Sequence, residues 1–198
     1  MGKGEATREA ILDEATRLAS RVGLHGLTIG SLAAQARLSK SGLFAHFRSK
    51  ESLQVQVLDH AAALFVEEVV RPALAVPRGE PRVRALFERW LAWCGDSLPG
   101  GCVFIFATSE FDDEPGPVRE RVVRAQRDWM DAIATVFRTG ITEGQFRADA
   151  DPDQFANDLY GIILAYHHAR RLLRDPQAER RARTALDRLL DDARPPRT

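Results

Sequence analysis

The sequence predicts an all-α protein of about nine helices, and three observations support this fold class. Apolar residues recur three and four positions apart along most of the chain, which is the spacing of one face of an α-helix. Glycine and proline gather in short stretches between these periodic segments, as expected for turns. The short apolar run at residues 103–107 has no second strand to pair with, so we expect a short buried helix there.

The first helix is expected over residues 5–22. Gly23 follows it directly, and glycine suits the left-handed conformation that commonly ends a helix. We therefore expect this helix to stop at Gly23 and to pack over the elements that follow. Four residues at helical spacing form its predicted apolar face: Ile11, Ala15, Leu18 and Val22.

The stretch Thr28–Leu53 predicts two short helices joined by a tight turn at Arg37-Leu38, followed by the start of a third helix. Thr28, Ser39 and Ser49 each precede one of these helices, where a side-chain oxygen can cap free N–H groups. The second helix begins with basic and small residues, which suits a helix-turn-helix whose second helix enters a DNA major groove. An ordinary helical hairpin is the alternative interpretation. The side chains expected to face inward are Ile29, Leu32, Ala33, Ala36, Leu43 and Phe47.

Six helices are expected after this stretch, separated by turns rich in proline or glycine. Pro72 is expected to end the first of them, a connector helix at about 50–71 whose wide apolar face can touch both the head and the body. We divide the chain into a helix-turn-helix DNA-binding domain, residues 1–52, and a larger helical domain, residues 53–198. The six helices are expected at residues 49–71, 81–98, 102–111, 118–139, 152–173 and 177–190.

The composition is that of an ordinary soluble protein, with 198 residues, 44% apolar and 28% charged, and a net charge of zero. The charge is unevenly distributed: residues 1–52 carry eight Lys and Arg against five Asp and Glu, and the remainder carries twenty against twenty-three. A basic end on an acidic body directs that end toward phosphates. The sequence has no signal-peptide pattern and no apolar run near 18 residues, so we expect a cytoplasmic protein.

The sequence lacks the common motifs of enzymes. It has no glycine-rich phosphate loop with a following lysine, no serine-centred nucleophile motif and no zinc-site spacing. The acidic residues from Glu110 to Glu114 lie beside prolines and are interpreted as a solvated turn. His167 and His168 are adjacent on a helix and point about 100° apart, so they do not readily share one metal ion. We expect neither an enzyme nor a cofactor.

The run from Leu38 to Leu53, LSKSGLFAHFRSKESL, resembles without a gap the DNA-binding domain of the TetR family of bacterial regulators. The upstream match comprises Ala10-Ile11-Leu12, Ala15, Gly23, Thr28-Ile29 and Ala33. Beyond the head, the resemblance is one of helical layout. It implies a homodimer that binds a palindromic operator in double-stranded DNA, with two heads about 34–36 Å apart.

The resemblance also implies roles for residues of the head. Thr28, Lys40 and Lys50 are expected to contact phosphates. His46 matches the family's histidine at the end of the recognition helix, which is a further phosphate contact. Phe44 departs from the family, in which tyrosine is usual, and so lacks the hydroxyl that binds a phosphate. The residues placed to meet base edges are Ser39, Lys40, Ser41, Gly42 and Ala45.

In the family, the body holds an effector pocket, and its last two helices pair with those of a second copy as a four-helix bundle. Here we expect an apolar or aromatic effector, with an aromatic core that has no cavity as the alternative. The candidate pocket residues are Trp90, Trp93, Cys94, Cys102, Phe104, Phe106, Trp129, Tyr160, Tyr166 and His167. The candidate dimer contacts are Tyr160, Ile163, Ala182 and Leu186, unless these residues only close the core of the monomer.

These inferences predict a ligand-responsive transcriptional repressor that blocks its operator until an effector releases it. A transcriptional activator is the first alternative. A regulator that responds to oxidation is the second, because Cys94 and Cys102 flank the break at residues 99–101 and can approach each other. A helical ligand-binding protein whose head no longer binds DNA is the third.

Overall fold

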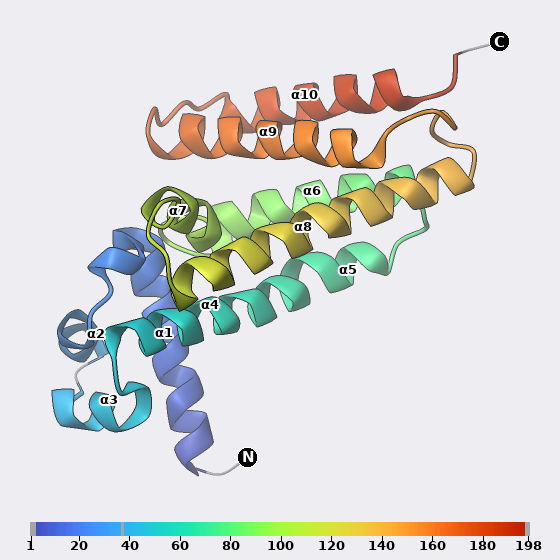
Figure 1. Ribbon diagram of the computed structural model, residues 1–198. Coiled ribbons are helices and arrows are strands. Elements are labelled where there is room, and N and C mark those ends of the chain that lie inside the picture. The colour runs from blue at the N-terminus through green and yellow to red at the C-terminus, as the bar shows by residue number, and fades with distance from the viewer. Residues whose placement is uncertain (1–2, 37, 197–198) are drawn as a thin grey trace. The chain divides into compact units, whose positions relative to one another are not determined.

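The computed structural model describes residues 3–36 and 38–196, and the regular structure of this part of the chain is entirely helical (Figure 1). This confirms the all-α prediction. Because the π-helical turns η1 and η2 continue neighbouring α-helices, the described residues form nine continuous helical stretches. Arg37, in the predicted turn, lies outside the described residues. The elements are α1 (Lys3–Gly26), α2 (Ile29–Ala36), α3 (Lys40–Phe47), α4 (Lys50–Phe65), η1 (Val66–Val70), α5 (Arg71–Leu74), α6 (Glu80–Ala92), η2 (Trp93–Ser97), α7 (Val103–Glu110), α8 (Pro117–Thr142), α9 (Pro152–Arg171) and α10 (Ala178–Ala193).

The chain forms two compact units that alternate along the sequence. The first unit comprises the residues up to Val66 together with Trp93–Gln126, and the second comprises Glu67–Ala92 and the residues from Arg127 onward. The chain first passes between the units inside η1 and returns where α6 meets η2. π-Helical turns are uncommon and frequently occur at functional positions.

In the first unit, α1 packs against α2, α4 and α7. The three predicted helix caps are present: Thr28 Oγ1 accepts a hydrogen bond from Ser31 N–H at 2.9 Å. Ser39 Oγ accepts one from Gly42 N–H at 3.1 Å, and Ser49 Oγ accepts one from Ser52 N–H at 3.0 Å. A cap of this kind is worth about 1 kcal/mol. These caps fix the ends of the short helices that carry the predicted DNA contacts.

The end of α1 differs from the predicted apolar stripe. Gly23 has a φ of 75°, which breaks the regular helix where a stop was expected. Val22 is 47% exposed, so its assignment to the buried face is wrong. After the break, the chain turns and inserts the fully buried Leu24 and Leu27 into the core, while Val22 lies against Gly26.

Pro72 does not end the connector helix at residue 71, because α5 continues to Leu74. Proline lacks an N–H and clashes with the carbonyl four residues earlier in an α-helix. The wider turn η1 directly precedes Arg71 and Pro72, and this local change of hydrogen bonding accommodates the ring.

In the second unit, α9 packs against α10, and a stack of three aromatic rings lies in the core. The ring centroid of Phe137 lies 4.4 Å from that of Phe146 and 4.0 Å from that of Phe155. Phe146 follows α8 in a segment that was predicted only as a connector. A Cβ at Gly140 would lie 2.4 Å from the Phe146 ring, so this close approach requires glycine.

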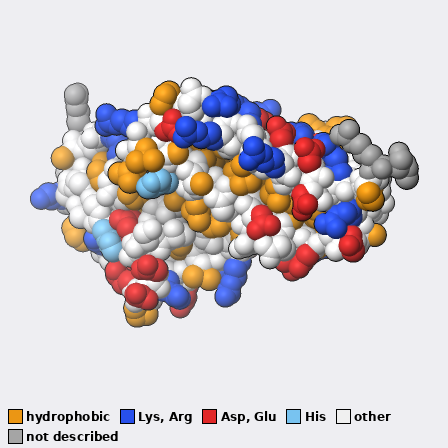
Figure 2. Space-filling view, turned by 90° about the horizontal axis from the view of Figure 1, so that it is seen from above, with side chains coloured by type: hydrophobic (Ala, Val, Ile, Leu, Met, Phe, Trp, Pro, Cys, Tyr) orange, Lys and Arg blue, Asp and Glu red, His pale blue; other side chains and the backbone are white. Residues whose placement is uncertain are grey.

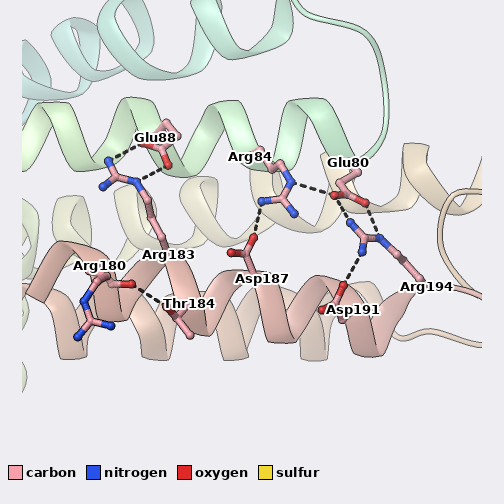
Figure 3. Close-up of polar contacts among 9 residues, drawn as sticks. All are labelled: Glu80, Arg84, Glu88, Arg180, Arg183, Thr184, Asp187, Asp191 and Arg194. Atoms are coloured by element: carbon pink, nitrogen blue, oxygen red, sulfur yellow. Dashed lines mark hydrogen bonds and ion pairs between the residues drawn. The ribbon is translucent and has the colours of Figure 1, made fainter. Parts of the chain in front are cut away.

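A row of ion pairs joins α6 to α10 (Figure 3). Arg183 forms two hydrogen bonds with Glu88, at 2.8 and 2.9 Å. Arg84 bonds to Asp187 at 2.6 Å and to Glu80 at 2.8 Å. Glu80 also bonds to Arg194, which comes from the end of α10, at 2.5 Å. The row fixes α10 in register against α6. Among the described helices, none combines the length and apolarity needed to cross a membrane.

Candidate DNA-binding surface and effector region

Thr28 and Lys40 come together at the start of α2. An ideal Cβ placed on Gly30 would lie 3.7 Å from Thr28 Oγ1 and 3.9 Å from Lys40 Nζ. The hydroxyl and the ammonium therefore face the same space, beside the N–H groups at the start of α2. A hydroxyl, a cation and a helix N-terminus are groups that bind phosphate.

Helix α3 presents a polar and open outer face. Leu43 and Phe47 are buried, as predicted, and hold the helix against the head. Lys40, Ser41, Gly42 and His46 are exposed on the outside. The would-be Cβ of Gly42 meets only the Ser39 hydroxyl, at 3.1 Å. A partner can therefore approach the backbone of α3 closely at this position.

Three further residues of this region were predicted to contact DNA: Ser39, Phe44 and Ala45. The Ser39 hydroxyl is used as the helix cap, and it also accepts a hydrogen bond from Ser41 Oγ at 3.3 Å. Phe44 is 53% exposed, so its ring belongs to the outer surface and not to the head's core. Ala45 lies on α3, and its side chain is outside the described part of the structure.

Lys50 lies at the first position of α4, and its ammonium is already bound within the head. Lys50 Nζ donates a hydrogen bond to the carbonyl oxygen of His25 at 2.8 Å. This bond ties the start of α4 to the end of α1. A phosphate contact by Lys50 would compete with this internal bond.

The predicted effector residues separate into two groups, one in each unit. In the first unit, Trp93, Cys94, Cys102 and Phe104 are buried and Phe106 is half-buried. Phe65, from α4, joins this cluster, with its ring centroid 5.5 Å from Trp93 and 6.3 Å from Phe104. The sequence placed Phe65 on the apolar face of the connector helix but gave no signal that it meets the cluster.

Cys94 and Cys102 are both reduced, and their thiols are in contact with each other. Cys102 is also the N-cap residue of α7. A hydrogen bond from the Cys94 thiol lowers the pKa of Cys102, helped by the backbone N–H groups of Ile105 and Phe104, against the opposing effect of burial. The Cys102 thiol is therefore more readily ionised than an ordinary cysteine.

In the second unit, Trp90 and Tyr166 form an edge-to-face ring pair with centroids 5.5 Å apart. Trp129 is buried, and Tyr160 and His167 are half-buried. Burial lowers the pKa of His167, and the charge of Arg171 adds to the effect. His167 is therefore neutral at pH 7. No group of three or more His, Cys, Asp or Glu side chains in the described residues is placed to hold a metal ion.

The predicted dimer residues lie mostly inside the monomer. Ile163, Ala182 and Leu186 are at most 5% exposed, and Tyr160 is half-buried. The outer surface of the same two helices is a groove of about 680 Å³ lined largely by small and apolar residues. Figure 2 shows apolar side chains between charged ones on the side where α9 and α10 lie in Figure 1. The groove is lined by Asn157, Asp158, Gly161, Ile162, Ala165, Tyr166, Ala169, Ala178, Arg181, Ala182, Ala185 and Leu189.

Comparison with known proteins identifies the family. Residues 11–57 match the bacterial regulatory proteins of the tetR family, and residues 79–186, more than half of the chain, match the tetracyclin repressor-like C-terminal domain. The chain belongs to the TetR family. It is a member of a family of bacterial regulators, and the first match covers the helix-turn-helix whose geometry is described above.

Individual relatives agree with the assignment of this chain to the TetR family. The HTH-type transcriptional repressor DhaR of Mycobacterium sp. (strain GP1) is 25% identical over 155 residues, which span 77% of this chain and 76% of that protein. A TetR transcriptional regulator from Chloroflexus aurantiacus J-10-FL is 29% identical, with a TM-score of 0.79 and 96% of each chain covered. A TetR-family regulator from Cytophaga hutchinsonii has a TM-score of 0.85 at 19% identity, covering 100% of this chain and 99% of that one.

Proposed function

We propose that this protein is a cytoplasmic transcriptional repressor that binds a palindromic operator as a homodimer and releases it when a small molecule binds the body. The observation that carries the DNA-binding part is the convergence of Thr28 and Lys40 at the start of α2, beside an exposed α3. The name of the relative DhaR supports repression over activation. An enzymatic role is not part of the proposal.

The experiment is to measure operator binding by the Lys40→Ala, Lys50→Ala double variant over a range of salt concentrations. We expect loss of specific binding, because two cations that contact phosphates are removed. Each lost phosphate contact should also lower the slope of log affinity against log salt by about 0.9. Arg124→Ala, which removes an exposed charge from α8, is the control. Unchanged affinity in the double variant would refute the assignment of these two lysines.

The homodimer is supported by the groove on α9 and α10. Gly161 lines it, and a Cβ at this residue would meet nothing within 4 Å. A glycine inside a helix costs about 1 kcal/mol relative to alanine, and here the monomer gains no room from it. Close approach of a helix from a second copy gives this glycine a use.

The proposed effector is apolar or aromatic, because both candidate groups are built from aromatic rings with few polar atoms. A compound library screened for release of the dimer from its operator tests this. We expect active compounds to lose effect in the Trp93→Phe or the Tyr166→Phe variant, depending on which group binds them. Unchanged response in both variants would place the effector elsewhere.

Oxidation is a second candidate input, because the Cys94 and Cys102 thiols are in contact. Hydrogen peroxide would convert the Cys102 thiolate to a sulfenic acid with release of hydroxide, which takes up the proton lost by the thiol and becomes one water. The Cys94 thiol would then attack that sulfur, form a disulfide and release a second water. Loss of operator binding on peroxide treatment, prevented by Cys94→Ser, supports this route; a disulfide that leaves binding unchanged excludes it.

A further inference from the structure

Glu110, the last residue of α7, forms hydrogen bonds with the end of α1. Its carboxylate accepts hydrogen bonds from Leu24 N–H at 2.8 Å and from His25 N–H at 3.1 Å. These amides directly follow the break at Gly23, and a Cβ there would lie 2.2 Å from Glu110 Oε1. The Glu110 side chain is only 16% exposed. Glu110 is therefore a partly buried structural carboxylate. The interpretation as a solvated turn is wrong for Glu110, whereas Asp112, Asp113 and Glu114 are exposed as expected.

The same two residues of α1 are held from the opposite side by α4. Gln54 Nε2 donates to the carbonyl oxygen of Leu24 at 2.7 Å, and Lys50 Nζ donates to that of His25 at 2.8 Å. The N–H groups of Leu24 and His25 therefore bind a side chain of α7, and their carbonyl oxygens bind side chains of α4. The chain reaches Thr28 only three residues later. This short segment is where α7, α4 and the DNA-binding helices meet, all within the first unit.

The other end of α7 is also fixed to α1. Gly100 N–H donates to Ser20 Oγ at 3.1 Å, and a Cβ at Gly100 would lie 1.6 Å from the Ser20 carbonyl oxygen. The aromatic and thiol cluster (Phe65, Trp93, Cys94, Cys102 and Phe104) lies near this start of α7, and Glu110 lies at the end of α7. Eight helical residues span about 12 Å, so the cluster and Glu110 lie at opposite ends of one short helix.

We propose that Glu110 is the positioning residue through which α7 sets the orientation of the DNA-binding helices. A shift of α7 moves the carboxylate, the carboxylate moves the amides of residues 24 and 25, and these carry Thr28 and the start of α2 with them. Because Gln54 and Lys50 hold the carbonyl oxygens of the same two residues, α4 takes part in this contact. The inference rests on the proposed DNA-binding function and names the contact that regulates it.

The matched control is Glu114. Glu114 Oε2 lies 2.9 Å from His25 Nε2, so it contacts the same residue, but both side chains are about half exposed. Exposed pairs of this kind contribute little. Glu114→Gln removes one charge near His25 without touching the backbone amides, whereas Glu110→Gln removes an acceptor from them.

The first test uses the full-length chain and the DNA sequence that the unmodified protein selects from a random pool. We expect Glu110→Gln to weaken binding about tenfold, comparable to a lost charge-assisted contact, with the same salt slope, because no phosphate contact is lost. Glu114→Gln should stay within about twofold. Affinities are corrected for the folded fraction at each temperature. Equal affinity for Glu110→Gln and the unmodified protein would overturn the inference.

The second test is a double-mutant cycle between the two ends of α7. Phe104→Leu disturbs the cluster mildly, and its site lies about 9 Å along the helix from Glu110. Independent sites at this distance combine additively, so a departure of about threefold or more from the product of the two single effects supports transmission through Glu110. A product within the error of additivity contradicts it.

A third measurement does not depend on DNA. Amide hydrogen exchange in residues 29–36 should be faster in Glu110→Gln than in Glu114→Gln, because α2 loses its fixed entry. If the unmodified protein selects no DNA, the proposed function fails, whatever the exchange result. If it binds DNA and α2 exchanges equally in both variants, the inference about Glu110 fails alone.

Discussion

At the scale of single residues, the helices of the head are capped by short-range hydrogen bonds that can be predicted from the sequence. The serine and threonine caps lie three residues from the amides they bind, so they could be predicted from spacing alone. The hydrogen bonds of Glu110 could not be predicted in this way, because its partners lie 86 and 85 residues away. Acidic residues beside prolines usually lie in solvated turns, and only the fold shows that Glu110 is partly buried and bound to two backbone amides.

Gly42 gives a prediction that separates stability from function. Gly42→Ala should raise the thermal midpoint by no more than about 2–4 °C, because the gain of about 1 kcal/mol from alanine in a helix is opposed by the 3.1 Å approach of its Cβ to the capping Ser39 hydroxyl. The same change should weaken operator binding about tenfold, the size of one lost base contact, since the methyl group occupies the open face of α3. Calorimetry and a binding titration check both parts. A variant that is more stable and binds equally well would show that DNA does not approach α3 at this residue.

At the scale of elements, the helices were predicted well where their periodicity is strong and poorly where their hydrogen bonding changes. The apolar run at residues 103–107 is the helix α7, as expected. The turns η1 and η2 carry no sequence signal that we recognised, and Pro72 gave a false end for the connector because a wider turn precedes it. The groove on α9 and α10 lies on the helices predicted for the dimer, and of the four residues chosen Ala182 is among those that line it.

Gly161 tests the role of that groove. Gly161→Arg should convert the dimer to a monomer, because it places a long cation where a second helix would approach, while the fold of the monomer stays intact. Thr184→Arg adds the same charge to the exposed surface of α10 outside the groove-lining residues and should leave the dimer unchanged. Sedimentation equilibrium and circular dichroism report the two properties. A dimeric Gly161→Arg protein would exclude this face as the interface.

The ion pairs between α6 and α10 predict a pH dependence of stability. The hydrogen bond from Arg194, followed by that from Arg84, lowers the pKa of Glu80 below its ordinary value of 4.5, although burial opposes the shift. A carboxylate whose pKa is lower in the folded state stabilises the fold above its unfolded pKa, and this contribution is lost as the pH falls through the folded pKa. Glu80→Gln should therefore melt at a lower temperature than the unmodified protein at pH 7, and the gap should close below about pH 4. A gap that is independent of pH would contradict this assignment.

At the scale of the whole molecule, the uneven charge and the helix-turn-helix indicated DNA binding before any fold was known. The family assignment and the exposed α3 agree with that prediction. The effector remained open for a physical reason. The aromatic residues predicted as one pocket fall into two units of the fold, and the chain crosses between these units where α6 meets η2. Residues such as Trp90 and Trp93 are close in sequence but belong to different groups.

The measurement that tests the central claim most directly is selection of bound DNA from a random pool, at two salt concentrations, with the purified full-length protein. We expect a palindromic sequence with half-sites about one helical turn apart and an affinity that falls steeply with salt. Enrichment of no sequence, or binding without salt dependence, would contradict the assignment of Thr28, Lys40 and α3 as a DNA-binding surface.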